Sequence, residues 1–338
     1  MSEQKKNTAV LGCGHWGKNL VRNFNKLGAL GLVCDVGEPG RAKSKELAPD
    51  VEVSAEFEEA FTRDDIEGVV LATPAETHLE LAMRAMESGK DVYVEKPMAL
   101  DFREGVRMKE FADRHKRILM VGHILEYHPA VKRLRALLAD GTLGKVNYIY
   151  SNRLNFGKIR TEENALWSFA PHDIAVILRL VGEMPLEVTA TGGSYITPNL
   201  ADVTISTMHF RSGVRAHIFV SWLNPFKEQK LVVMGDKKMA VFDDVSKDAK
   251  LSLHQKRVDF DNRVPQLSTG ENEVLELAEE EPLRNECQHF LDCIESREEP
   301  LTSAESGIQV LRVLQACQTS LELHGRPVVL QDLEAYMS

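Results

Sequence analysis

Short apolar runs alternate with longer segments of helical spacing through the first third of the chain. In the longer segments apolar residues recur every three or four positions, as at Leu20, Phe24 and Leu27. This spacing predicts helices, and the apolar runs between them predict strands at residues 9–11, 32–35, 68–72, 91–94 and 118–121. Short strands separated by helices form a parallel, doubly wound sheet, whose ligands bind beyond the carboxyl ends of the strands.

The pattern changes near Lys145, where longer segments alternate between apolar and polar residues. They predict strands at residues 145–156, 186–194, 203–210, 214–222 and 230–234, with Arg211-Ser212-Gly213 as a hairpin turn. Helical spacing returns at residues 283–294 and 304–323. The predicted fold class is therefore α/β: residues 1–124 form the doubly wound parallel sheet, and residues 125–338 form an α+β domain with a large, mainly antiparallel open sheet. An open apolar sheet face usually needs a partner, so we expect a homodimer or homotetramer.

Composition narrows the class of protein further. The 338 residues are 43% hydrophobic and carry a net charge of −10, which argues against nucleic acid or an anionic membrane as the main partner. No run is long and apolar enough to span a bilayer, and the polar residues 1–7 do not resemble a signal peptide, so a cytoplasmic location is expected. The five cysteines lack metal-ligand spacing and predict free thiols and no metal site. A series of glutamates between residues 271 and 281 predicts a solvated connection.

The first predicted strand leads into a glycine-rich turn, Gly12-x-Gly14-x-x-Gly17, followed by a helix. In this motif the first glycine permits a tight turn, the second lets the backbone approach a pyrophosphate, and the third lets the helix pack closely on the strand. Asp35 ends the second strand, at the distance where an acidic side chain reaches the adenosine ribose hydroxyls of NAD. Because this carboxylate would repel a 2′-phosphate, we expect NAD rather than NADP.

Four motifs together resemble the Gfo/Idh/MocA oxidoreductases over nearly the whole chain. They are the glycine-rich turn, Ala72-Thr73-Pro74 with His78, Glu95-Lys96-Pro97, and Pro171-His172-Asp173. The resemblance implies an N-terminal Rossmann domain that binds NAD, and hydride transfer between a sugar or polyol hydroxyl carbon and nicotinamide. It also implies that Lys96 lies beside the reacting hydroxyl and that a cis peptide precedes Pro97.

Oxidation of an alcohol requires a group that takes the hydroxyl proton as the hydride leaves. Lys96 can do so if its surroundings lower its pKa, and as a cation it would stabilise the developing alkoxide. His172 is the second candidate, because histidine titrates near neutrality. Many family members have aspartate four residues before this histidine, where this chain has Ser168. The sequence leaves open which of the two accepts the proton, and whether Asp173 orients a neighbour or caps a helix at 174–180.

The remaining site residues follow from the resemblance. It places cofactor contacts at Gly12, Gly14, His15, Trp16, Gly17, Asp35, Thr73, Pro74, His78, Glu95, Lys96 and Trp167. Thr73 and Thr77 are equally typical of a helix N-cap. The expected substrate contacts are Lys96, Asn155, Lys158, Arg160, Ser168, His172 and Asp173. The cations in this set suit an anionic substrate group, although a solvated basic face has the same composition.

Four segments resemble one branch of the family, the UDP-N-acetylglucosaminuronate 3-dehydrogenases of bacterial surface-polysaccharide (O-antigen) sugar synthesis. They are residues 122–129, 152–160, 165–173 and 221–229. The branch oxidises the 3-hydroxyl of a UDP-N-acetylhexosaminuronate to a 3-keto sugar, and in some members 2-oxoglutarate reoxidises the bound NADH. Two alternatives remain: an NAD-dependent dehydrogenase of another sugar or inositol, and a non-catalytic NAD or sugar-binding regulator. The presence of both Lys96 and His172 argues against the regulator.

Overall fold

The computed structural model describes residues 7–157 and 159–337, and the chain divides into two compact units. The first comprises Met1–Tyr127 and Glu280–Leu311, and the second comprises His128–Glu279 and Arg312–Ser338. The division after Tyr127 lies close to the expected boundary at residue 124. The assignment of residues 280–311 differs: the sequence predicts them in the second domain, whereas the structure packs them in the first unit.

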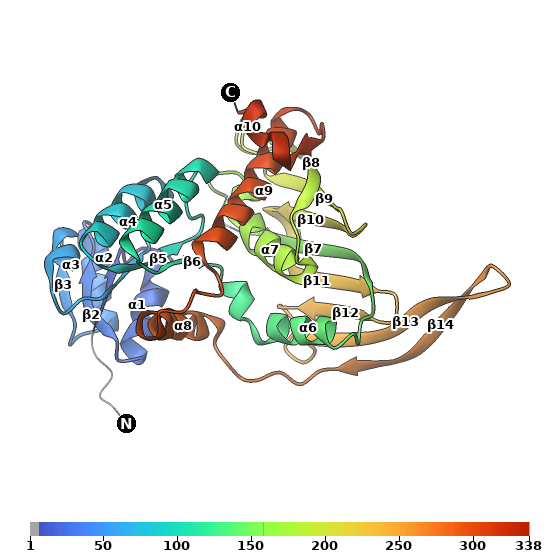
Figure 1. Ribbon diagram of the computed structural model, residues 1–338, viewed down its shortest axis with the longest axis horizontal. Helices are drawn as coiled ribbons and strands as arrows, with labels where there is room; N and C mark the ends of the chain where they lie inside the picture. The colour runs from blue at the N-terminus through green and yellow to red at the C-terminus, as the bar shows by residue number, and fades with distance from the viewer. Residues whose placement is uncertain (1–6, 158, 338) are drawn as a thin grey trace. The chain divides into compact units, whose positions relative to one another are not determined.

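The first unit is built on a six-stranded parallel sheet in the order β3-β2-β1-β4-β5-β6 (Figure 1). Its strands are β1 (Thr8–Leu11), β2 (Leu30–Cys34), β3 (Glu52–Ser54), β4 (Gly68–Leu71), β5 (Asp91–Glu95) and β6 (Leu119–Gly122). Helices cover both faces, so the central strands are buried on both sides and consist of nearly continuous apolar residues. This sheet confirms the predicted Rossmann architecture.

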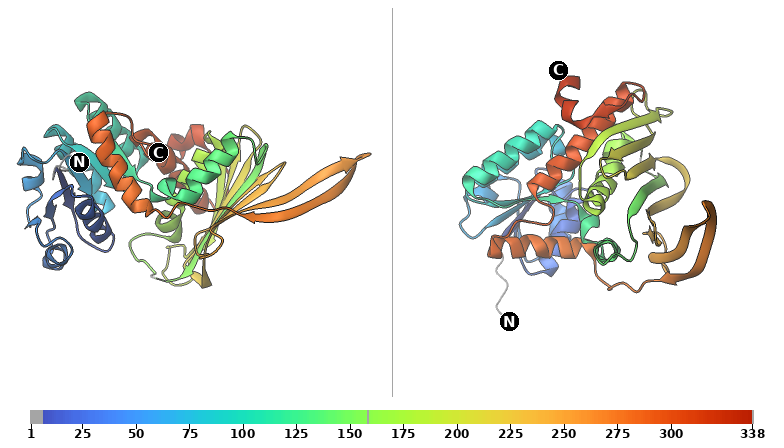
Figure 2. Two further views of the ribbon diagram at one scale, coloured as in Figure 1. Left: turned by 90° about the horizontal axis from the view of Figure 1, so that it is seen from below. Right: turned by 45° about the vertical axis from the view of Figure 1, so that its right-hand side comes forward.

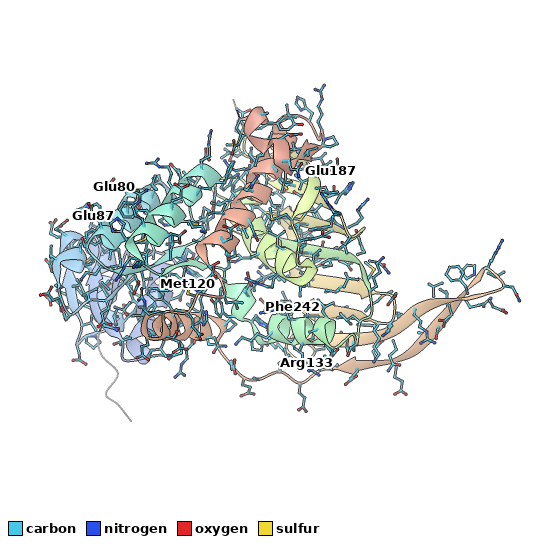
Figure 3. All side chains as sticks on the ribbon, in the orientation of Figure 1. Glu80, Glu87, Met120, Arg133, Glu187 and Phe242 are labelled. Atoms are coloured by element: carbon cyan, nitrogen blue, oxygen red, sulfur yellow. The ribbon has the colours of Figure 1, made fainter. Side chains whose placement is uncertain are left out.

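The helices of the first unit are α1 (Gly17–Lys26), α2 (Glu38–Leu47), α3 (Glu58–Thr62), α4 (His78–Glu87), α5 (Phe102–His115) and α8 (Pro282–Ser296). Figure 1 shows α4 and α5 together on one side of the sheet, and α1 packs against α8. Side chains on the outer face of α4, such as Glu80 and Glu87, are exposed, whereas Met120 of β6 is fully buried (Figure 3). The Asp101 side chain caps α5 by accepting a 2.8 Å hydrogen bond from the Arg103 N–H.

The second unit contains a nine-stranded sheet in the order β14-β13-β12-β11-β7-β10-β9-β8-β15. Its strands are β7 (Val146–Phe156), β8 (Pro185–Gly193), β9 (Val203–Phe210), β10 (Arg215–Ser221), β11 (Leu223–Gly235), β12 (Met239–Asp243), β13 (Leu251–Asp261), β14 (Val264–Val274) and β15 (Val328–Val329). Among the described strands of this sheet, only the pairing of β7 with β10 is parallel. The mainly antiparallel sheet agrees with the expected fold class.

Helices α6 (Pro129–Ala139) and α7 (Ala165–Val181) lie in the second unit, with the short α10 (Leu333–Tyr336) near the chain end. Helix α9 (Ala304–Glu322) begins in the first unit and continues into the second. Strands β13 and β14 form a long hairpin that extends beyond the other strands of this sheet (Figure 2). Glu271 and Glu273 belong to β14, so the expected solvated connection begins only after this hairpin.

Candidate active site

The glycine-rich turn has the shape that a dinucleotide requires. Gly12 has φ +91°, and a Cβ on it would lie 2.8 Å from the Ala72 carbonyl oxygen. A Cβ on Gly17 would lie 2.1 Å from the Gly12 carbonyl oxygen, so helix α1 can approach β1 only with glycine there. Gly14 faces open space, with no atom within 4 Å of a Cβ. The backbone around it is therefore accessible to a pyrophosphate at the start of α1, and the site fits NAD.

Asp35 lies at the carboxyl end of β2, where the motif requires it. Its carboxylate accepts a 2.6 Å hydrogen bond from the Cys13 N–H and a 2.7 Å bond from the Gly37 N–H. The Arg41 guanidinium donates to the carbonyl oxygens of Asp35 and Val36, at 2.9 and 2.8 Å. Arg41 is thus bound to the loop that positions Asp35, an arrangement that suits ribose hydroxyls better than a phosphate.

The loop after β4 is held by its own side chains. The Thr73 and Thr77 hydroxyls are 2.7 Å apart, and Thr77 also donates to the Pro74 carbonyl oxygen. Thr77 occupies the N-cap position of α4, as the alternative interpretation expects, but its side chain makes no capping hydrogen bond to the helix. This loop follows β4 at the same edge of the parallel sheet as the glycine-rich turn that follows β1.

His78 is 1% exposed and its ring nitrogens face two backbone carbonyl oxygens. Nε2 lies 3.0 Å from the Thr73 oxygen and Nδ1 lies 3.1 Å from the Pro97 oxygen. Burial lowers the pKa of His78, and hydrogen bonding to the carbonyls opposes that shift. His78 therefore connects the loop after β4 to the loop after β5 through main-chain contacts, and its expected role at the cofactor stays a prediction.

Glu95 and Lys96 occupy the end of β5, and the Lys96–Pro97 peptide is cis, as the resemblance implies. Glu95 accepts hydrogen bonds from Trp16 Nε1 at 2.7 Å, from the Tyr93 hydroxyl at 3.0 Å and from the Lys96 N–H at 3.2 Å. Burial raises the pKa of Glu95, and these bonds oppose the rise. Glu95 therefore joins the glycine-rich turn to the strand that carries Lys96, while Trp16 and His15 remain exposed at the turn.

Helix α7 carries the candidate residues of the second unit. It begins at Ala165 with Asn164 as its N-cap, whose side chain accepts a 3.1 Å hydrogen bond from the Trp167 N–H. Ser168 is buried, whereas Trp167 and His172 are half-buried. Ser168 and His172 are four residues apart in the helix and therefore lie on one face of it.

Asp173 lies inside α7 and is 2% exposed, so of the two roles left open by the sequence, helix capping is wrong. Its carboxylate accepts hydrogen bonds from Arg153 Nε at 2.7 Å, from Arg153 Nη2 at 3.1 Å and from the Ser151 hydroxyl at 2.7 Å. This buried ion pair joins α7 to β7. Asp173 thus orients the helix that carries His172, and we retain it in the site as a positioning residue.

The segment after β7 contains the remaining expected substrate contacts. Asn155 is half-buried on β7, and Lys158 lies outside the described residues. Arg160 forms ion pairs with Glu163 at 3.2 Å and with Glu162 at 3.8 Å. These two glutamates reduce the positive charge that Arg160 offers to a substrate, so the segment is less cationic than its lysine and arginine residues alone predict.

Three further residues of the first unit were not found from the sequence: Tyr93 and Glu286, which lie near Glu95, and Glu126, which lies near Glu286. All three are buried. The sequence pattern could have revealed Glu286, because this glutamate lies between Leu283 and Phe290 on the otherwise apolar face of helix α8. A carboxyl group on such a face needs a polar partner in the core.

Other features of the described residues add no chemistry to this set. They contain no cluster of three or more His, Cys, Asp or Glu side chains that could hold a metal, and their five cysteines are buried and free. None of their helices combines the length and apolar character needed to cross a bilayer.

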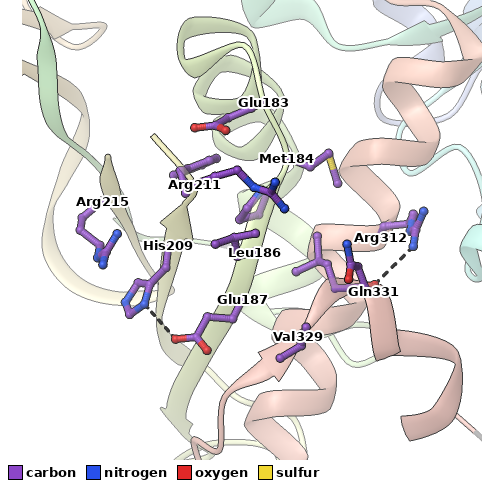
Figure 4. Close-up of a pocket in the computed structure, with 13 residues that line it drawn as sticks. Glu183, Met184, Leu186, Glu187, His209, Arg211, Arg215, Arg312, Val329 and Gln331 are labelled. Carbon is purple, nitrogen blue, oxygen red and sulfur yellow. Dashed lines mark hydrogen bonds and ion pairs between the residues drawn. The ribbon is translucent and has the colours of Figure 1, made fainter. Parts of the chain in front are cut away.

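A cavity of about 550 Å³ in the second unit contains none of the expected site residues (Figure 4). Its lining includes Arg211, Arg215 and Arg312, opposed by Glu183 and by a His209–Glu187 ion pair of 2.9 Å. Figure 4 shows the cationic and acidic groups interspersed around the same opening. This mixed lining indicates neither a cofactor nor a defined substrate group.

Comparison with known proteins places the chain in a family. Residues 6–123 match the oxidoreductase family with an NAD-binding Rossmann fold, and residues 131–241 match the GFO/IDH/MocA C-terminal domain. A 2,7-anhydro-N-acetylneuraminate hydratase of Mediterraneibacter gnavus is 31% identical over 196 residues, which are 55% of this chain and 52% of that protein. The scyllo-inositol 2-dehydrogenase (NAD(+)) of Bacillus subtilis is 25% identical over 99% of both chains.

The UDP-N-acetylglucosamine 3-dehydrogenase of Acidithiobacillus ferrooxidans is 24% identical over 93% of this chain and 97% of that protein. Its solved structure superposes with a TM-score of 0.82 at 22% identity, covering 94% of this chain and 98% of the other. This likeness shows the fold of both units. Since the family matches together span most of the sequence and agree with the glycine-rich turn and the Lys96 motif, the chain belongs to the Gfo/Idh/MocA family of NAD-binding oxidoreductases.

Proposed function

We propose that the protein is a dehydrogenase that oxidises a secondary hydroxyl of a nucleotide-linked sugar with NAD. One observation carries the proposal: Lys96 follows β5 at the carboxyl edge of the parallel sheet, the same edge at which the glycine-rich turn follows β1. Ligands of such sheets bind beyond this edge. A lysine placed there suits chemistry at the reactive end of a bound dinucleotide.

The chain's own residues supply binding and proton handling. The turn around Gly14 and the Asp35 carboxylate hold the cofactor, and bound NAD supplies the hydride acceptor. Lys96 contacts the substrate hydroxyl and either takes its proton or stabilises the alkoxide as a cation. His172 is the other proton acceptor that the resemblance provides, and variants of each residue decide between the two assignments.

The substrate we propose is a UDP-N-acetylhexosaminuronate, oxidised at its 3-hydroxyl for the synthesis of bacterial surface-polysaccharide sugars. The branch resemblance supports this choice, as does the similarity along the whole chain to a UDP-N-acetylglucosamine 3-dehydrogenase. Asn155, Lys158 and Arg160 are the proposed contacts to the anionic groups. Arg160 already pairs with Glu163 and Glu162, so binding a carboxylate there requires the substrate to displace at least one of them.

A screen of NADH formation across candidate substrates tests the proposal. It compares the UDP-linked N-acetylhexosaminuronate with its neutral hexosamine counterpart and with scyllo-inositol, each with and without 2-oxoglutarate. We expect the uronate to give the highest kcat/KM. Replacing Arg160 with alanine should lower that value by about ten- to a hundredfold, because a hydrogen bond to a charged group contributes about 1.5–3 kcal/mol. Equal activity on the neutral UDP-sugar, or equal loss on both, would reject uronate recognition.

A second candidate is an NAD-dependent inositol or unlinked-sugar dehydrogenase. The similarity to a scyllo-inositol 2-dehydrogenase over 99% of both chains favours it. In the same screen, turnover of scyllo-inositol without turnover of any UDP-sugar would establish this candidate in place of the first.

A further inference from the structure

The strand that carries Lys96 is packed against a buried group of acidic side chains that the proposed reaction does not use. Tyr93 and Glu95 come from β5, Glu126 from the 3-10 helix at Ile124–Tyr127, and Glu286 from α8, far along the chain. Tyr93 and Glu286 are fully buried, and Glu95 and Glu126 are 8% and 2% exposed. Three carboxyl groups in one apolar core cannot all be ionised at low cost, so their protons must be distributed unequally.

Helix α8, which carries Glu286, packs against Tyr93 through Phe290. Phe290, one helical turn after Glu286, contacts the Tyr93 ring edge to face, with centroids 5.9 Å apart and planes at 68°. On the other side, a Cβ on Gly122 would lie 2.7 Å from the Tyr93 hydroxyl oxygen and 3.0 Å from the Glu95 carboxyl carbon. The hydroxyl and the Glu95 carboxyl are therefore enclosed, and Tyr93 has little room to turn away.

The donors around each carboxyl group differ. Glu95 receives three: the indole N–H of Trp16 at 2.7 Å, the Tyr93 hydroxyl at 3.0 Å and the Lys96 N–H at 3.2 Å. Within the described part of the chain, neither oxygen of Glu286 has a hydrogen-bond partner. A carboxylate is stabilised by such donors, so Glu95 is the better place for the negative charge.

The tyrosine determines where the proton lies. A phenol has one hydrogen, and Tyr93 gives it to Glu95, which leaves its oxygen able only to accept. Glu286 lies near this hydroxyl without a hydrogen bond to it, so a contact between the two is favourable only if Glu286 carries a proton that it can donate. Burial raises the pKa of Glu286 well above its usual range, and the charges of Glu95 and Glu126 raise it further.

We propose that Glu286 is a protonated carboxylic acid, that a small turn of its carboxyl group lets it donate to Tyr93, and that it thereby acts as a positioning residue for Glu95 and Lys96. In this arrangement Glu286 donates to Tyr93, and Tyr93 donates to Glu95. Glu95 remains ionised and accepts the hydrogen bond from Trp16. The ionisable groups that face Glu286 are Tyr93, Glu95, Glu126, Tyr127 and Cys287. The positioning role rests on the proposed function of Lys96, whereas the protonation state does not.

Infrared spectroscopy of the wild-type protein tests the protonation state without any substrate. We expect a carboxylic-acid C=O band at neutral pH that shifts in D₂O and is lost in Glu286→Gln. Glu295→Gln, an exposed glutamate on the same helix, is the matched control and should keep the band. A spectrum with no such band, or a band lost in Glu126→Gln instead, would overturn the proposal.

Unfolding measurements give a second readout. A carboxyl whose folded pKa is raised binds a proton in the folded state that it releases on unfolding, so stability falls as pH rises above the usual value of 4.5. Glu286→Gln removes this proton uptake. The unfolding equilibrium constant of the variant, divided by that of the wild type, should therefore fall as pH rises above 4.5. The expected decrease is up to about tenfold per pH unit. A ratio independent of pH would contradict the proposal.

The positioning role is tested by comparing two neutral replacements. Glutamine retains a donor for the Tyr93 oxygen, whereas Glu286→Leu fills a similar volume without one. We expect kcat to be about tenfold higher in the glutamine variant than in the leucine variant, equivalent to one hydrogen bond, with NAD affinity measured separately for each. Equal kcat values in the two variants would reject the positioning role of Glu286. If the wild-type protein turns over none of the substrates, the proposed function itself is rejected.

Discussion

The N–H of Cys13 donates a 2.6 Å hydrogen bond to Oδ2 of Asp35, so the acidic side chain that ends β2 is joined to the turn that follows β1. Gly37 donates to the other carboxylate oxygen at 2.7 Å. Asp35 is therefore held in place before a cofactor binds, and its charge lies at the sheet edge where the motif places the adenosine ribose. This relationship leads to a direct test of cofactor selectivity.

Replacing Asp35 with alanine should weaken NAD binding and narrow its advantage over NADP. The carboxylate both accepts from ribose hydroxyls and repels a 2′-phosphate, and we expect the ratio of the two Kd values to fall by at least about tenfold. Fluorescence titration with NADH and NADPH measures it. Glu38→Gln, which removes an exposed acid that pairs with Arg41, is the matched control and should leave the ratio unchanged. Wild-type affinity for NADPH equal to that for NADH would contradict the expectation.

Lys96→Ala should abolish hydride transfer while NAD binding stays largely intact, because the proposed contact of the ammonium group is the substrate hydroxyl. Loss of a proton-handling group lowers rates by about 10²–10⁴-fold. Single-turnover formation of NADH, together with a separate NAD titration, distinguishes the two steps. Lys109→Ala removes a surface lysine that pairs with Asp113 and should behave as the wild type. Normal turnover in the Lys96 variant would exclude the proposed mechanism.

His172→Ala should reduce kcat by about 10²–10⁴-fold if this imidazole takes the proton. The pH dependence of kcat then loses one limb, because the titrating group is absent. A smaller loss with an unchanged pH profile would assign the proton to Lys96 and leave His172 a role in binding. The measurement is a pH series of initial rates on the substrate identified by the screen.

Asp173→Ala should destabilise the protein by about 3–5 kcal/mol, because it leaves the Arg153 guanidinium buried without its counter-ion. Urea denaturation measures the change. Combining Asp173→Ala with Arg153→Met should recover part of the loss, since no buried charge then remains. If the single variant is as stable as the wild type, the ion pair does not hold α7 against β7.

The open face of the nine-stranded sheet should pair with a second copy and bury more than about 1,000 Å². Tyr150 and His217 stack on this face with centroids 5.3 Å apart, and Ile205 on the neighbouring β9 is 45% exposed. Sedimentation at micromolar concentration should show a dimer or tetramer. Ile205→Glu should weaken association by about tenfold or more, since a buried side chain of this size contributes about 1.5–3 kcal/mol.

Val36→Glu, at an exposed apolar position of the first unit, is the control for this experiment and should leave the oligomer intact. A wild-type monomer at micromolar concentration would show that the sheet face has no partner of this kind.

The parts of the fold predicted from the sequence are those encoded by local patterns. Buried parallel strands such as β4 consist of continuous apolar residues, and the glycine-rich turn, Asp35 and Lys96 follow such strands directly. Strands β13 and β14 were missed because most of their residues are exposed on both faces, so apolar and polar positions do not alternate regularly.

The parts of the site that were missed depend on contacts between distant segments. Asp173 is paired with Arg153 from another element, and Glu286 joins the first unit only after the chain has formed strands β7 to β14 of the second sheet. Arg160 is different, since Glu162 and Glu163 follow it closely and their effect on its charge was available from the sequence. Neighbouring acids therefore need to be counted whenever a cluster of cations is interpreted.

Helix α8 packs on α1 and β5 although it follows eight of the nine strands of the second sheet in the sequence. During synthesis on the ribosome, Phe24 and Tyr93 of the cofactor-binding unit are therefore covered only after helix α8, beyond residue 280, has been translated. At about 5–20 residues per second, the intervening segment takes on the order of ten seconds to translate. For that time the unfinished unit exposes apolar surface of the kind that chaperones bind, and a fragment ending at Tyr127 would retain this exposure permanently.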